Sequence, residues 1–125
     1  MSLPDNINDL VRVCHNQMLE AGWWHDLETG ELQVLTPERV GDKLMLIVTE
    51  IAEAKEGHRR NLQDDKLPHR PMVEVELADS IIRICDLAGA MSLDLGGALT
   101  EKLAYNRQRA DHKRENRIKP DGKKT

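Results

Sequence analysis

The chain has 125 residues and a mass of 14.2 kDa, a length that supports one domain. Phe is absent and the only aromatic residues are Trp23, Trp24 and Tyr105, so the core must be aliphatic. The first 100 residues carry 18 acidic and 9 basic side chains, an acidic balance unlike that of a nucleic-acid-binding domain. The longest apolar run, Leu44–Val48, is far shorter than the roughly 20 residues of a membrane helix. With no signal peptide visible, we expect a cytoplasmic protein with no membrane or nucleic-acid partner.

Four amphipathic helices can be drawn along the sequence. Apolar residues at helical spacing predict the first over about residues 6–21, and Gly22 ends it. The second begins at Thr36-Pro37-Glu38, where Thr is a typical cap and Pro a typical first residue, and Gly57 stops it. The third runs from Pro71 to about Gly89.

The fourth helix is expected from Ser92 or Asp94 to about Ala110. Gly96 and Gly97 weaken its start, which indicates that another helix packs closely there. We therefore predict an all-α, four-helix bundle-like domain over residues 1–110, followed by a polar basic tail, residues 111–125, that is mobile or loosely docked.

Each predicted helix carries one apolar stripe that we expect to be buried in the bundle. In the central two helices the stripes are Val40, Leu44, Ile47, Ile51 and Ala54, and Val73, Leu77, Ile81, Ile84 and Ala88. Cys14 and Cys85 fall in apolar periodic segments far apart in the sequence. They are interpreted as reduced core thiols.

Two carboxylate pairs stand in the middle of the second and third predicted helices. Glu50 and Glu53 are spaced i, i+3, and Glu76 and Asp79 repeat that spacing, so each pair shares one helix face. Four carboxylates on two packed helices repel one another unless a counterion is present. Oxygen ligands favour a hard divalent cation, Mg²⁺ first. The alternative is a solvated acidic face, which is the usual interpretation of a single such pair.

Two further charged residues follow on the third helix. Arg83 comes one turn after Asp79 and is expected to bridge to a carboxylate, and Asp86 is expected to pair with Arg83. No His stands three residues after a Glu, which disfavours the Glu-x-x-His ligation of di-iron bundles.

The fourth helix supplies the opposite charge. Lys102, Asn106 and Arg109 lie on one face, and two cations flanking an amide suit a polyphosphate. Arg offers a bidentate fork and Lys a point charge. A solvated basic face is the alternative.

These motifs resemble those of the MazG-like all-α nucleoside triphosphate pyrophosphohydrolase superfamily, whose members include dimeric dUTPases and dCTP pyrophosphatases. The matching segments are Glu50-Ile-Ala-Glu53, Glu76-Leu-Ala-Asp79 and Lys102-Leu-Ala-Tyr-Asn106-Arg-Gln-Arg109. The resemblance covers residues 6–110. It implies hydrolysis of (deoxy)nucleoside triphosphates at the α–β phosphoanhydride, giving a monophosphate and pyrophosphate, in nucleotide-pool clearance. It also implies Mg²⁺ as cofactor, with Mn²⁺ able to substitute, and a homodimer or dimer of dimers.

The same resemblance assigns roles to individual residues. Glu50, Glu53, Glu76 and Asp79 would hold the metal, and Lys102, Asn106 and Arg109 would face the phosphates. Family members place a His in the first helix and a Trp after it around the base or sugar, and His15 and Trp24 look like that pair. The alternative for this pair is structural, with His15 on the surface and the Trp residues filling a core that has no Phe.

One departure from the family pattern concerns the catalytic base. Many members carry a Glu that can act as base at the position occupied here by Thr49, so the assignment passes to Glu53. Thr49 also favours the main alternative function, a catalytically silent helical interaction module with the same fold. Phosphoribosyl-ATP pyrophosphatase is a second alternative.

Overall fold

The computed structural model describes residues 2–125, and its elements are helical. They are α1 (Leu3–Glu20), α2 (Pro37–Arg59), α3 (Met72–Ala90), α4 (Leu95–Gln108), the 3-10 turn η1 (Ala110–His112) and α5 (Arg114–Arg117). Within residues 2–125 the only β-type pairing is two isolated bridges, His25 with Leu32 and Gln63 with Pro71. The prediction of an all-α chain is therefore confirmed. None of the described helices is both long and apolar enough to cross a membrane.

The helix ends follow from local sequence signals. Gly22, at φ +84°, adopts the left-handed conformation that ends α1. At the start of α2 the Thr36 hydroxyl accepts a hydrogen bond from the Arg39 backbone N–H at 3.2 Å, with Pro37 as the first helical residue. Asp94 caps α4 by accepting from the Gly97 N–H at 2.9 Å. These ends lie within a few residues of the predicted ones.

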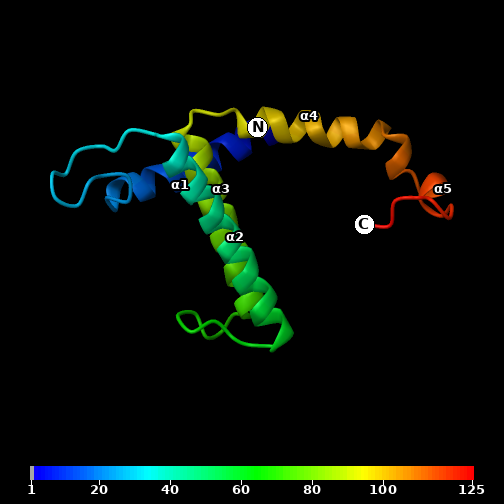
Figure 1. Cartoon of the computed structure of the whole chain (residues 1–125), viewed down its shortest axis with the longest axis horizontal. Helices are drawn as coiled ribbons and strands as arrows, with labels where there is room; N and C mark the ends of the chain where they lie inside the picture. The colour runs from blue at the N-terminus through cyan, green and yellow to red at the C-terminus, as the bar shows by residue number, and fades with distance from the viewer. Residues whose placement is uncertain (1) are drawn as a thin grey trace. The chain divides into compact units, whose positions relative to one another are not determined.

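The chain divides into two compact units. We call residues 9–93 the body and residues 2–8 with 94–125 the terminal unit. In the body, α2 and α3 run side by side as a long antiparallel pair (Figure 1). The terminal unit contains α4 together with residues 111–125, which form part of η1 and the short α5. This division lies near residue 93, and the predicted boundary at residue 110 stays a prediction.

Three glycines permit close approaches between elements. A Cβ on Gly57 would lie 2.7 Å from the Met72 side chain, and one on Gly89 would lie 2.6 Å from the His15 Cβ. In the terminal unit, a Cβ on Gly96 would lie 2.2 Å from the Pro4 carbonyl oxygen, so the start of α1 packs directly on the start of α4. The close packing predicted at Gly96 is confirmed.

The buried core is small and comes mainly from α1, α3 and Trp24, with one residue from α2. Its hydrophobic members are Val11, Cys14, Trp24, Ala54, Cys85, Leu87 and Ala88. Cys14 and Cys85 are both free thiols and both buried, as expected.

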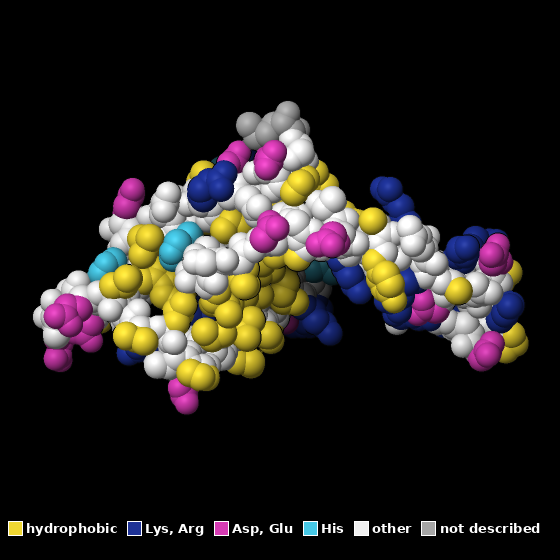
Figure 2. Space-filling view, turned by 90° about the horizontal axis from the view of Figure 1, so that it is seen from above, with side chains coloured by type: hydrophobic (Ala, Val, Ile, Leu, Met, Phe, Trp, Pro, Cys, Tyr) yellow, Lys and Arg dark blue, Asp and Glu magenta, His cyan; other side chains and the backbone are white. Residues whose placement is uncertain are grey.

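The predicted burial of the apolar stripes is wrong for much of α2 and α3. Five members of these stripes are 39% to 50% exposed: Leu44, Ile51, Leu77, Ile81 and Ile84. The physical reason is that a two-helix hairpin gives each helix one main neighbour, so a wide stripe is covered on one side only. Figure 2 shows hydrophobic side chains gathered over one face of this part of the molecule.

Candidate functional site

The pairing of α2 with α3 brings three of the four predicted metal ligands together. Glu50 projects from α2, and Glu76 and Asp79 project from successive turns of α3. One carboxylate oxygen from each residue lies within 4.8 Å of the other two. We call these three residues the acid cluster. They come from segments 26 or more residues apart, so their convergence is a property of the helix pairing.

Glu76 is the most buried member of the acid cluster. The residue is 8% exposed, and its Oε2 atom is fully buried with no hydrogen-bond partner. Burial, a hydrogen bond with Glu50 and the charges of the surrounding carboxylates raise the pKa of Glu76 to about 8. Burying a carboxylate oxygen without a hydrogen-bond donor costs free energy, and binding a proton or a cation would remove that cost.

Glu50 behaves in the opposite way. Burial acts to raise its pKa, but hydrogen bonds with Glu76 and with Arg83 outweigh burial and lower the pKa of Glu50 overall. The Arg83 guanidinium donates from Nε to Glu50 Oε1 at 2.8 Å. The raised pKa of Glu76 and the lowered pKa of Glu50 together favour a proton on Glu76 beside an ionised Glu50.

The expected bridge from Arg83 to a carboxylate is confirmed, and its partner lies on the neighbouring helix. The expected pairing of Arg83 with Asp86 is wrong. Asp79, the third member, has its pKa raised, first by burial and then by the charge of Glu50.

Glu53 lies outside the acid cluster. Its side chain is exposed, and its negative charge contributes to the raised pKa of Glu76. Thr49 is exposed as well, and its hydroxyl donates to the Leu46 carbonyl of its own helix at 2.7 Å. The roles of Glu53 as fourth ligand and as base stay predictions.

Sequence reasoning missed one acidic residue beside the cluster. Asp64, in the loop between α2 and α3, is 6% exposed, and its charge helps to raise the pKa of Asp79. Its Oδ2 accepts the backbone N–H groups of Lys66 and Leu67 at 2.9 and 2.7 Å. No spacing rule marks it, because it follows Asn61-Leu62-Gln63 in a polar loop outside any helix.

The donor set of the acid cluster fits a divalent cation. Its ligands are all carboxylate oxygens, the type that Mg²⁺ and Mn²⁺ accept. The orphaned Oε2 of Glu76 is the observation that supports this fit, because a cation would satisfy the atom without requiring protonation. Glu50, Glu76 and Asp79 are the residues that would hold the ion.

His15 and Trp24 meet around a second carboxylate in the body. Asp86 Oδ1 accepts a hydrogen bond from Trp24 Nε1 at 2.8 Å and lies 2.8 Å from His15 Nδ1. The two rings pack edge to face, with centroids 5.9 Å apart. Trp24 is 2% exposed, whereas Trp23 is 66% exposed. Sequence reasoning missed the place of Asp86 here, because its partners lie on α1 and on the loop that follows it.

A cavity of about 330 Å³ opens beside this group. It is lined by His15, Leu19, Trp24, Leu32, Gln33, Leu35 and Ala90. The walls are mainly apolar, with few polar groups, which is typical of a site for a small organic ligand. We call this cavity the aromatic pocket.

The predicted phosphate-binding residues lie in the terminal unit. Lys102 and Asn106 are on α4, and Arg109 follows its last residue. Both cations lie over the Tyr105 ring in cation–π contacts. Lys102 Nζ is 4.8 Å and the Arg109 guanidinium carbon 5.8 Å from the ring centroid. Arg109 also makes a bidentate ion pair with Asp111, at 3.0 and 2.7 Å. Asn106 Oδ1 is buried without a partner.

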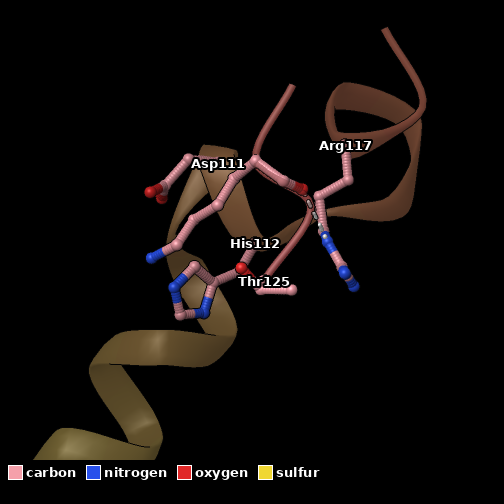
Figure 3. A pocket seen from close by; sticks show the side chains of 5 residues that line it. Asp111, His112, Arg117 and Thr125 are labelled. Carbon is pink, nitrogen blue, oxygen red and sulfur yellow. Dashed lines mark hydrogen bonds between the residues drawn. The ribbon is translucent and has the colours of Figure 1, made fainter. Parts of the chain in front are cut away.

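The terminal unit has a hollow of about 250 Å³ beyond α4. Figure 3 shows Asp111, His112, Arg117 and Thr125 around it. The Arg117 guanidinium donates to the carbonyls of Lys123 and Lys124, at 3.2 and 3.1 Å, and so fastens the last residues to α5. The cationic group is thus used to hold the chain end.

Comparisons with models of protein families, with curated proteins and with solved structures give no match for this chain.

Proposed function

We propose that this chain is a Mg²⁺-dependent pyrophosphohydrolase that splits (deoxy)nucleoside triphosphates into a monophosphate and pyrophosphate. The observation that carries the proposal is the acid cluster, in which Glu50, Glu76 and Asp79 converge and a buried oxygen of Glu76 has no partner. A solvated acidic face would leave its carboxylates in water, where each oxygen is hydrated and the pKa is ordinary. The burial of Glu76 favours a bound cation over that alternative.

Two residues of the body, Arg83 and Glu53, support the chemistry that a bound Mg²⁺ would supply. Mg²⁺ supplies charge neutralisation for phosphate oxygens and lowers the pKa of water. Arg83 holds Glu50 ionised and fixes its orientation through the 2.8 Å hydrogen bond. Glu53 is exposed one turn from Glu50, where it is free to accept the proton of an attacking water.

The terminal unit carries the groups proposed to bind the leaving pyrophosphate, Lys102, Asn106 and Arg109. Arg109 already binds one carboxylate, Asp111, with both branches of its fork. A phosphate must replace that carboxylate, so Asp111→Asn should lower the KM for the triphosphate. An unchanged KM would contradict a role for Arg109 in phosphate binding.

A second candidate function is favoured by Thr49. Its hydroxyl is bonded to its own helix, and no carboxylate stands at the position where relatives of the proposed superfamily carry a base. A silent interaction module would retain metal binding but would not hydrolyse nucleotides. The native protein distinguishes the two, because an active enzyme releases pyrophosphate and a silent module releases none. Thr49→Glu should in addition raise the rate of an active enzyme.

We further propose that a second copy of the chain covers the half-exposed apolar face of α2 and α3. Exposed patches of this kind on a small chain mark protein interfaces. On each helix the exposed apolar residues stand one turn apart, Leu44 and Val48 on α2 and Leu77 and Ile81 on α3. Sedimentation at micromolar concentration should give a dimer or tetramer, and Ile81→Glu should shift it toward monomer. A native monomer would contradict the proposal.

The enzymatic test is pyrophosphate release from a panel of the ribo- and deoxynucleoside triphosphates with Mg²⁺. The native protein should release pyrophosphate, and Glu76→Gln should not. Glu74→Gln is the matched control, because Glu74 lies on the same helix but is exposed and paired with Arg70. Equal rates in the native protein and Glu76→Gln, or no release from any triphosphate, would overturn the proposal.

A further inference from the structure

Arg83 lies at the edge of the acid cluster and adjoins two of its members. On α3 it follows Glu76 and Asp79 at the i, i+3, i+7 spacing of one helix face, so it extends their row by one turn. From α2, Glu50 accepts a hydrogen bond from Arg83 Nε at 2.8 Å. Burial is the largest influence on the pKa values of Glu50 and Asp79, and the positive charge of Arg83 acts against it at both residues. The guanidinium therefore neighbours both acids.

The protein uses only one of the nitrogen atoms of this guanidinium. The group carries five N–H donors in a fixed planar fork. Within residues 2–125, the hydrogen bond from Nε to Glu50 is the only one that the Arg83 side chain makes. Neither of its two Nη atoms is among the fully buried polar atoms that lack a partner, and the side chain is 40% exposed. Both Nη groups are therefore open to a ligand from solution.

A cation in the acid cluster would change the electrostatic role of Arg83. In the metal-free protein the guanidinium offsets part of the negative charge of the three acids. When these acids hold a divalent ion, the same guanidinium lies beside a second positive charge, and the two repel each other. An anion in contact with both would relieve this repulsion. Because the fork is bonded to Glu50, itself a proposed metal ligand, such an anion lies within its reach.

Phosphate has the chemistry to satisfy both groups. Its oxygens are the hard ligands that Mg²⁺ accepts, and arginine forks bind phosphate through two parallel N–H···O bonds. We propose that Arg83 is a further phosphate-binding residue, which keeps Nε on Glu50 and offers its two Nη groups to a metal-bound phosphate. This inference rests on the proposed function for the class of ligand. It goes beyond the resemblance, which places the phosphate-binding residues at Lys102, Asn106 and Arg109.

The test measures the binding of inorganic pyrophosphate by calorimetry at saturating Mg²⁺. Pyrophosphate carries no base and is the proposed product, so base preference and turnover do not enter the measurement. Arg83→Gln should weaken its binding about tenfold or more, the size of a lost charge-assisted hydrogen bond. Arg83→Lys keeps the charge but lacks the fork, and should stay at least about threefold weaker than the native protein. Arg70→Gln is the matched control, because Arg70 is exposed and pairs with Glu74, and it should bind as the native protein does.

A second measurement separates phosphate binding from mere support of Glu50. Calorimetry with Mn²⁺ alone should give Arg83→Gln a metal affinity within about threefold of the native value, because the guanidinium is not a ligand. A residue that acted only by orienting Glu50 would weaken metal binding, and saturating metal would then restore native pyrophosphate affinity. That restored affinity would overturn the proposal. Native affinity in Arg83→Lys would equally contradict a contact through the fork.

Failure of this inference can be told apart from failure of the proposed function. A native protein that hydrolyses triphosphates, with an Arg83→Gln variant that binds pyrophosphate equally well, refutes the assignment of Arg83 alone. A native protein that binds pyrophosphate through Arg83 but releases none from any triphosphate refutes the proposed function and supports the phosphate site. Glu76→Gln should lose the Mg²⁺-dependent part of pyrophosphate binding, and full retention of that binding would contradict a metal-bound phosphate.

Discussion

Glu76 and Asp86 lie on the same helix, α3, and each is 8% exposed, yet their surroundings differ completely. Asp86 accepts a hydrogen bond from Trp24 Nε1 and also lies 2.8 Å from His15 Nδ1, and no acid of the acid cluster adjoins it. Glu76 faces Glu50 and Asp79, and one of its oxygens has no donor. The protein supplies hydrogen-bond partners to Asp86, whereas one oxygen of Glu76 has no partner within the chain. Burial alone therefore does not mark a binding group, whereas burial without a partner does.

The largest expected effect separates the two acids by activity. Glu76→Gln should reduce pyrophosphate release at least about a hundredfold, more than the loss typical of a group that only supports a metal ligand. It should also abolish the rise in melting temperature that Mg²⁺ gives the native protein. The checks are a pyrophosphate assay and thermal melts with and without Mg²⁺. An unchanged Mg²⁺ shift in the variant would refute the metal site.

The second prediction concerns stability, where a substitution of Asp86 should have a larger effect than a substitution of Glu76. Asp86→Ala should destabilise the protein by about 2–4 kcal/mol, because it leaves the buried Trp24 N–H without its acceptor, removes the partner of the His15 ring and opens space in the core. Glu76→Gln should change the stability of the metal-free protein by less than about 1 kcal/mol at neutral pH, because Gln resembles the protonated acid. Urea unfolding of the two variants measures both values. Equal losses would show that the two carboxylates are not different in kind.

The third prediction concerns pH in the metal-free protein. With its pKa raised to about 8, Glu76 keeps its proton in the folded chain, whereas the unfolded chain releases it near 4.5. The folded state then binds more protons between these values, so the free energy of unfolding falls as pH rises through that window. The raised pKa of Asp79 acts in the same direction. The lowered pKa of Glu50 acts mainly below 4.5, where its stabilisation is lost as pH falls.

We expect a loss of about 2 kcal/mol between pH 5 and pH 8.5, less than the full shift of Glu76 corresponds to, because the ionised cluster can admit water. Urea unfolding in the presence of a chelator measures it. Glu76→Gln should flatten most of the dependence, and Mg²⁺ should reverse it by binding the ionised cluster. Stability that stays constant or rises over this range in the native, metal-free protein would contradict the proton on Glu76.

The smallest expected effect tests the edge of the acid cluster. Glu53 is exposed and lies outside the group of converging oxygens, although its charge reaches Glu76. Glu53→Gln should lower activity about tenfold, at the low end of the losses typical of residues that support a metal ligand and below those of a full general base. The shift in melting temperature with Mg²⁺ should largely persist. A loss as large as that of Glu76→Gln would place Glu53 among the principal ligands.

The sequence by itself determined the elements of this protein, because helix ends depend on residues a few positions apart. Thr36-Pro37 and Gly22 fix two ends through local hydrogen bonding and backbone conformation. Helical periodicity likewise placed Glu76 and Asp79 on one face. The amino-acid order also determined the chemical type of the proposed site, since carboxylates spaced i, i+3 on two helices indicate a cation before any contact is known.

Only the tertiary structure decided which of these side chains meet. The pairing of α2 with α3 brings Glu50, Glu76 and Asp79 together and leaves Glu53 outside the acid cluster. The same pairing places Arg83 within hydrogen-bond distance of Glu50. Asp86 finds His15 and Trp24 across more than 60 residues of sequence, a distance at which periodicity carries no information. Burial was equally a tertiary matter, because the exposure of the stripes on α2 and α3 depends on how many neighbours each helix acquires. A pattern in sequence specifies a face, and the packing of other helices decides what covers it.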